Sequence, residues 1–198
     1  MKYINQLQCS HWLYVTRTDM DDENREWGKT STVKSSGCGM CSAVMVADRL
    51  LPNCEFDLND AISLSYEVKA NFKRGTSYAR FAPAFAEKLG LRWEASKDIE
   101  DLRHCLRTGG AAVLLVAGDY EGHTGLFTHG GHYMAAINEE PDGRIAILDP
   151  AYYPGKYDEE GRTGKVEVIN DVITLCDGDT LEKETEPKPT PYYLFWRK

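Results

Sequence analysis

The stretch SSGCGMCSAVM, residues 35–45, sets two cysteines three positions apart at the start of a long apolar run. We predict a helix over residues 38–51, ended by Pro52, that has no wide polar face and is therefore central and buried. Cys38 opens this helix between two glycines, where the helix dipole and free backbone N–H groups favour a thiolate. The glycines allow a sharp backbone turn and the close approach of a substrate. Cys38 is therefore a candidate nucleophile, and a buried structural cysteine is the alternative.

The rest of the chain places helices first and strands later. We predict three more helices at 58–72, 77–89 and 98–106, and strands at 111–117, 132–138, 144–149, 165–170 and 192–196. Two segments are predicted to be loops, a polar one at 16–36 and a charged, proline-rich one at 177–191. This order predicts an α+β fold with an antiparallel sheet. We expect one domain over 1–198, with a helical part at about 1–110 and a sheet part at about 111–198.

Composition excludes several classes of protein. The 198 residues carry a net charge of −8 and show no basic stripe, so we expect no nucleic-acid partner. No apolar stretch approaches the roughly 20 residues of a membrane span, and the N-terminus lacks a signal-peptide core, which predicts a cytoplasmic location. The acidic run at 19–23 lacks the glycine and glutamate of a calcium loop. The six cysteines are too sparse for a disulfide scaffold, and we predict reduced thiols.

A base for Cys38 is predicted at His132, which opens a strand directly after a glycine-rich loop. The partner of this histidine follows from hairpin geometry. If residues 139–143 form the turn, His132 lies opposite a residue near 150, and Asp149 lies beside it to within about a residue of register. A carboxylate there would hold the imidazole tautomer and stabilise its protonated form. A strand-ending turn is the alternative role for Asp149.

Three segments together resemble the papain-like cysteine peptidases, and most closely the double-glycine leader peptidases of bacteriocin exporters. These segments are residues 36–45 (SGCGMCSAVM), 131–136 (GHYMAA) and 147–150 (ILDP), in that order. The resemblance implies a Cys38, His132 and Asp149 triad, and an N-terminal glutamine that donates to the oxyanion. Gln6 matches that glutamine best, and Gln8 is the fallback. One departure is that Met follows Cys38-Gly39, where the family commonly has Pro.

The resemblance implies an enzyme that cleaves a peptide or amide bond of a peptide or protein substrate through an acyl-thioenzyme. It requires no cofactor and no metal. Either water or an amine or thiol can resolve such an intermediate, so hydrolysis and acyl transfer both stay open. The exporter-associated members carry a transporter after the peptidase, and their double-glycine specificity is not carried over to this chain.

Three other functions compete with this one. Cys38 and Cys41 form a C-x-x-C pair that could be a redox dithiol, although such pairs usually follow a strand directly. The same cysteines with His129 and His132 could bind zinc, although zinc-binding histidines usually have about three to five residues between them. A catalytically silent papain-like binding module is the third alternative. The intact glutamine, cysteine, histidine and aspartate set disfavours it.

Overall fold

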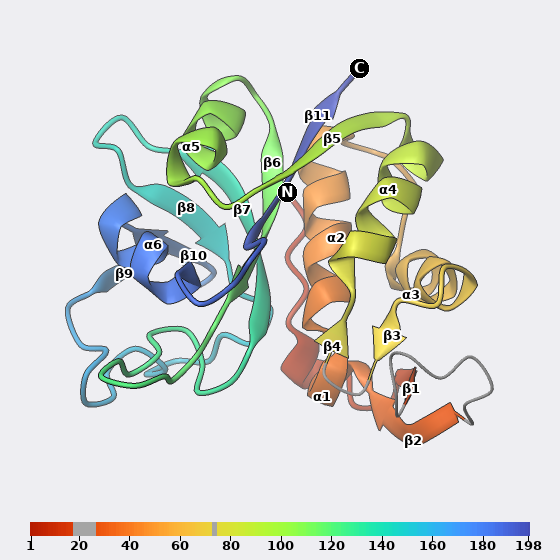
Figure 1. The fold of residues 1–198 in the computed structure, drawn as a ribbon, viewed down its shortest axis with the longest axis horizontal. Helices are drawn as coiled ribbons and strands as arrows, with labels where there is room; N and C mark the ends of the chain where they lie inside the picture. Colours follow the sequence, from red (N-terminus) through yellow and green to blue (C-terminus); the bar gives the residue numbers. More distant parts are fainter. Residues whose placement is uncertain (18–26, 73–74) are drawn as a thin grey trace.

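The computed structural model describes residues 1–17, 27–72 and 75–198. Helix α2 (Cys38–Leu50) runs through the middle of the molecule, and ten of its residues are buried (Figure 1). The remaining helices are η1 (Gln6–Gln8), α1 (Val33–Ser36), α3 (Leu58–Glu67), α4 (Tyr78–Leu89), α5 (Ile99–Arg107) and α6 (Gly178–Thr185). The predicted central helix is confirmed, as are the helices predicted at 77–89 and 98–106, to within one residue at each end.

A seven-stranded antiparallel sheet packs against α2. Its strand order is β5-β11-β6-β7-β8-β10-β9. The strands are β5 (Leu91–Ser96), β6 (Ala111–Val116), β7 (His132–Glu139), β8 (Ile145–Leu148), β9 (Val166–Ile169), β10 (Ile173–Cys176) and β11 (Tyr192–Arg197). A smaller sheet of order β2-β1-β3-β4 contains β1 (Leu13–Arg17), β2 (Trp27–Thr32), β3 (Asn71–Phe72) and β4 (Gly75–Thr76).

Alternation along the strands gives the large sheet two buried faces. On β6, Val113 belongs to the hydrophobic cluster around α2, whereas Leu114 belongs to a second cluster with α5 and α6. Figure 1 accordingly shows α2, α3 and α4 on one side of the sheet and α5 and α6 on the other. Because helices cover both faces, inner strands such as β6 and β8 read as nearly continuous apolar runs, whereas the edge strands β5 and β9 do not.

Two predicted loops contain regular structure. Part of 16–36 forms β1, β2 and α1, while the acidic run at 19–23 lies outside the described residues. Within 177–191, α6 begins where the Asp177 carboxylate accepts a hydrogen bond from the Thr180 N–H at 2.8 Å. The charged sequence of α6 concealed an inner face on which Leu181 and Glu184 are buried.

Other boundaries differ from the sequence prediction for local reasons. The helix predicted at 58–72 ends at Glu67, because Lys69 adopts a left-handed backbone with φ of 53°. Asn71 then enters β3 and donates from Nδ2 to the Val15 carbonyl at 2.6 Å. Strand β5 belongs to the large sheet although it precedes residue 111, and neither β5 nor β10 was predicted.

Candidate active site

Cys38 is the first residue of α2, and tight packing fixes the backbone on both sides of it. A Cβ atom at Gly37 would lie 2.5 Å from Val33 Cγ1, and one at Gly39 would lie 3.0 Å from Tyr78 Cε2. The Tyr78 hydroxyl also donates to the Gly39 carbonyl at 2.5 Å. A larger residue at either position would collide with Val33 or Tyr78. The two glycines therefore allow these side chains to pack closely against the start of the helix, where the thiol lies.

His132 is the first residue of β7 and is hydrogen-bonded to the predicted carboxylate. Its Nε2 lies 2.7 Å from Asp149 Oδ1, and both side chains are buried. The half-buried Cys38 thiol lies near enough to the same imidazole for each group to shift the pKa of the other. The structure thus brings the three predicted residues together.

The hairpin that joins His132 to Asp149 has a slightly different register from the predicted one. Ala135 pairs with Leu148, and an irregularity follows Ala136, which places the pairing about one residue from the prediction. Strand β8 ends at Leu148, and the Asp149 carboxylate accepts the Ala151 N–H at 2.8 Å. Asp149 therefore follows the end of the strand and also contacts the histidine.

The electrostatics of this chain favour an ion pair. Burial alone would raise the pKa of the Cys38 thiol, but the hydrogen bond and charge of His132 and the backbone bonds of Tyr133 and Gly39 outweigh it and lower that pKa. Burial would lower the pKa of His132, but the charge and hydrogen bond of Asp149 raise it from 6.5 to about 9. Both shifts favour a thiolate at Cys38 and an imidazolium at His132.

Asp149 has two further partners that the sequence did not point to. Lys156 Nζ donates to its Oδ2 at 2.5 Å, and the Tyr157 hydroxyl donates to the same oxygen at 2.7 Å. Burial would raise the pKa of Asp149, but His132 and Lys156 hold it well below its usual range. A lysine in a Pro-Gly-Lys-Tyr turn is typical of a protein surface. Only the folded structure therefore shows that Lys156 is buried and contacts Asp149.

Gln6 lies buried on η1, next to the turn that leads into Cys38. Its backbone N–H donates to the Pro150 carbonyl at 2.7 Å, and its side-chain Nε2 donates to the Lys34 carbonyl at 3.0 Å. One amide hydrogen remains available, and among the described residues Oε1 is buried with no hydrogen-bond partner. Gln8, the fallback, is exposed.

The competing redox and zinc sites gain no support from the geometry. Cys41 is fully buried one turn below Cys38, and burial raises the pKa of its thiol well above the ordinary value. His129 lies in a surface network, with Nδ1 2.9 Å from Asp119 and Nε2 3.0 Å from Arg162. Within residues 1–17, 27–72 and 75–198, no group of three or more His, Cys, Asp or Glu is arranged to hold a metal ion.

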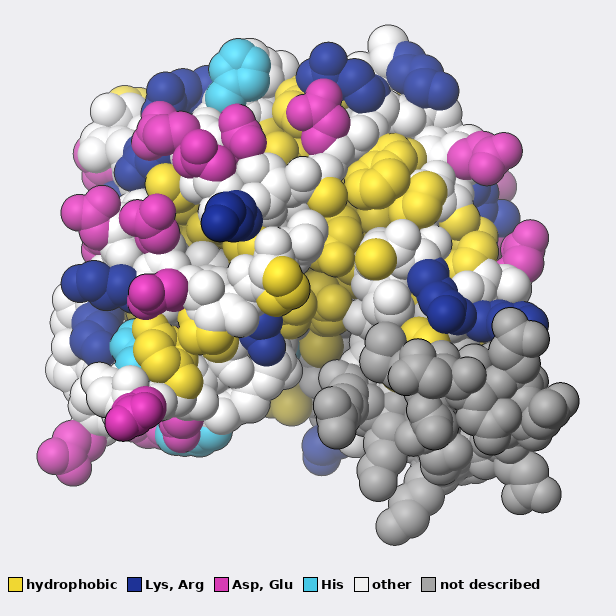
Figure 2. Space-filling model, viewed as in Figure 1, with side chains coloured by type: hydrophobic (Ala, Val, Ile, Leu, Met, Phe, Trp, Pro, Cys, Tyr) yellow, Lys and Arg dark blue, Asp and Glu magenta, His cyan; other side chains and the backbone are white. Residues whose placement is uncertain are grey.

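A pocket of about 180 Å³ lies between α4 and the sheet. Its walls come from the β3–β4–α4 segment and from the sheet: Phe72, Gly75, Ser77, Tyr78, Ala79, Tyr133 and Tyr193. Tyr133 directly follows His132, and Tyr78 contacts the residue after Cys38. Figure 2 shows hydrophobic side chains along the junction between the sheet and the helices. The pocket is therefore an aromatic recess lined by sequence neighbours of two candidate site residues.

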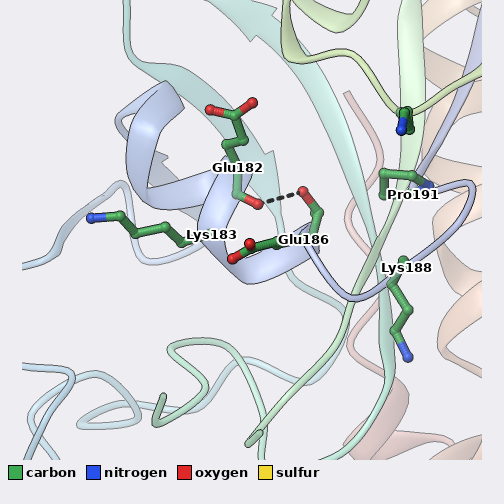
Figure 3. Close-up of a pocket in the computed structure, with 7 residues that line it drawn as sticks. Glu182, Lys183, Glu186, Lys188 and Pro191 are labelled. Carbon is green, nitrogen blue, oxygen red and sulfur yellow. Dashed lines mark hydrogen bonds between the residues drawn. The ribbon is translucent and has the colours of Figure 1, made fainter. Parts of the chain in front are cut away.

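A larger pocket of about 390 Å³ lies on α6 and the loop that follows it (Figure 3). The described residues that line it carry neither a thiol nor an imidazole, and they include both lysines and glutamates. In Figure 3, Lys183 and Lys188 extend away from each other. We find no converging reactive groups there, so its size does not make it the candidate active site.

Neither a protein-family model nor a curated protein matches the sequence. Several solved structures share its fold, including the following two. A Bacillus anthracis chain described as a C39-like peptidase is 12% identical, with a TM-score of 0.53 over 82% of this chain and 88% of its own. The peptidase domain of Streptococcus ComA, a bifunctional ABC transporter involved in a quorum-sensing pathway, is 14% identical, with a TM-score of 0.51 over 92% and 98%.

The likeness to these peptidases confirms the predicted fold class, an α+β papain-like fold. It covers 82% of this chain in one comparison and 92% in the other. None of the described helices is long and apolar enough to cross a membrane.

Proposed function

We propose that this chain is a cysteine peptidase that cleaves a peptide or amide bond through an acyl-thioenzyme. The observation that carries the proposal is the buried hydrogen bond between His132 and Asp149 beside the Cys38 thiol, with the pKa of the thiol lowered and that of the imidazole raised. These shifts favour the reactive forms of a nucleophile and a proton donor.

Each step of the reaction then has a group to perform it. Cys38 Sγ attacks the carbonyl carbon, and the C=O electron pair moves onto the oxygen. When the tetrahedral intermediate collapses, the C–N bond breaks and the departing amine takes a proton from His132. The neutral His132 then removes a proton from water, which attacks the thioester and releases the acid product and Cys38.

Gln6 and the start of α2 are the proposed holders of the oxyanion. Helix N-termini leave backbone N–H groups without intrahelical partners, and Cys38 lies at that end of α2. The Lys34 carbonyl orients the Gln6 amide through one of its two hydrogens, which leaves the second free to donate to the oxygen. Both donors are held in place before substrate arrives, as this kind of stabilisation requires.

The substrate class follows from the pocket between α4 and the sheet. Its tyrosine and phenylalanine rings would bury an apolar side chain. Ser77 adds a polar side chain to the wall. The pocket is linked to the candidate site through Tyr133, which follows His132, and through Tyr78, which contacts Gly39. We therefore propose peptides or proteins with an apolar residue near the cleavage site.

Digestion of a mixed peptide library, followed by mass spectrometry of the products, tests this function. We expect cleavage products that end in a free acid, complete loss of them in Cys38→Ala, and near-normal amounts in the matched variant Cys41→Ser. Products that carry an added amine or thiol would instead assign acyl transfer. Cleavage by purified Cys38→Ala at the wild-type rate would refute the proposal.

A further inference from the structure

Lys156 is a buried cation for which the proposed reaction has no step. Its side chain is only 5% exposed, and its Nζ donates to Asp149 Oδ2 at 2.5 Å and to the Ala151 carbonyl at 3.2 Å. The opposite oxygen of the same carboxylate contacts His132 Nε2 at 2.7 Å. Asp149 therefore lies between two cations, one from β7 and one from the segment after β8.

The charges of the reactive groups explain why a second cation belongs there. A thiolate at Cys38, an imidazolium at His132 and a carboxylate at Asp149 sum to one negative charge. A net charge in a buried site is unfavourable unless a partner neutralises it. Lys156 supplies that partner on the side of the carboxylate away from the histidine, which brings the sum to zero.

On the premise of the proposed peptidase, we propose that Lys156 is a positioning residue for its reaction. Its ammonium fixes the Asp149 carboxylate against His132 and neutralises the charge of the buried group. The lysine touches neither substrate nor the reacting sulfur, and acts only through Asp149. A cation separated from His132 by one carboxylate lowers the pKa of the imidazole by roughly 1–2 units at an effective dielectric constant of about 20. Removal of that cation is therefore expected to raise the pKa.

Other groups around the carboxylate define the controls. The titratable groups that contact Asp149 among the described residues are His132 from β7 and Lys156 and Tyr157 from the segment after β8, with Tyr3 from the N-terminal segment on the Asp149 backbone carbonyl. Tyr157 donates to the same oxygen as Lys156 without a charge. Tyr157→Phe therefore removes a hydrogen bond while the charge sum stays the same. Lys165, exposed in the same segment, gives Lys165→Met as a matched surface control.

The test compares Lys156→Met with wild type, Lys156→Arg, Tyr157→Phe and Lys165→Met, using two measurements on each. One is the pH dependence of the alkylation of Cys38 by iodoacetamide, with the adduct mapped by mass spectrometry. The other is the NMR titration of the histidine side chains, in which His132→Gln identifies the signal of His132. Thermal unfolding reports the fold of each variant, and Lys156→Gln replaces Lys156→Met if the latter is unfolded.

We expect the alkylation midpoint of Cys38 and the titration of His132 to move to higher pH by about 1 unit in Lys156→Met. Lys156→Arg and Lys165→Met should stay near wild type, and Tyr157→Phe should move less than Lys156→Met. A folded Lys156→Met or Lys156→Gln whose two midpoints equal those of wild type would overturn the role of Lys156, even if its melting temperature falls. If wild-type Cys38 is not labelled ahead of the other cysteines at acidic pH, the peptidase proposal itself fails, and this one with it.

Discussion

Replacing Asp149 with asparagine tests whether the carboxylate creates the ion pair. The pKa of His132 is raised from 6.5 to about 9, chiefly by Asp149, which corresponds to roughly 3 kcal/mol in favour of the imidazolium. Asparagine keeps the size of the side chain and loses its charge. Only the smaller effect of Cys38 then opposes burial, and we expect the pKa of the imidazole to fall below 6.5. The rate of Cys38 alkylation at pH 6 should fall about 100-fold, because a neutral imidazole no longer stabilises the thiolate.

The same substitution has a second effect that a double variant separates from the first. Asp149→Asn leaves the Lys156 ammonium buried without its anion, which typically costs about 3–5 kcal/mol of stability. Adding Lys156→Met removes that stranded charge. The double variant should therefore recover much of the free energy of unfolding, measured in urea, and yet keep the slow alkylation. Stability and reactivity are thus expected to move independently.

Asp158→Asn is the matched control, because it makes the same change at an exposed position in the same segment. It should leave both the alkylation rate and the unfolding free energy near wild type. The reasoning is refuted if folded Asp149→Asn alkylates at pH 6 within a few-fold of wild type, or if its His132 signal still titrates at about 9.

Three further outcomes are expected. Gln6→Ala should lower kcat about 10²–10³-fold with little change in KM, whereas Gln8→Ala should leave both unchanged, as measured on a cleaved library peptide. Gly39→Ala should lower the free energy of unfolding by about 1–3 kcal/mol in urea, since its Cβ would meet the Tyr78 ring at 3.0 Å. The free energy of unfolding should fall as the pH drops through and below 3.8. The folded protein holds Asp149 ionised to lower pH than the unfolded chain does, so this loss should be weaker in Asp149→Asn.

Local sequence patterns were sufficient to predict the centre of the site. The apolar run after Cys38 predicted α2, and a glycine-rich loop before an apolar strand predicted the position of His132. Hairpin counting then predicted Asp149 to within a residue of register. The signals for α2 and His132 lie within a few positions of the residues that they concern, and the signal for Asp149 comes from the turn of the same hairpin. A single sequence therefore carries all three.

The partners of Asp149 on its other side could not be predicted in this way. Lys156 and Tyr157 follow Asp149 through a series of turns, where no periodicity indicates which side chains point inward. Helix α6 was missed for a related reason. Its buried face rests on few residues, among them the charged Glu184, whose carboxylate contacts His123 and the Leu126 N–H. Such buried charges resemble surface residues until their partners are known.

Strand β11 completes the large sheet. It comes after the other described strands in the chain, yet it pairs on one side with β5 and on the other with β6, the neighbour of the strand that begins at His132. A ribosome therefore releases α2 and β7 before β11 can be inserted between β5 and β6. The segments that carry the candidate site are made early, and the sheet on which they pack is completed last.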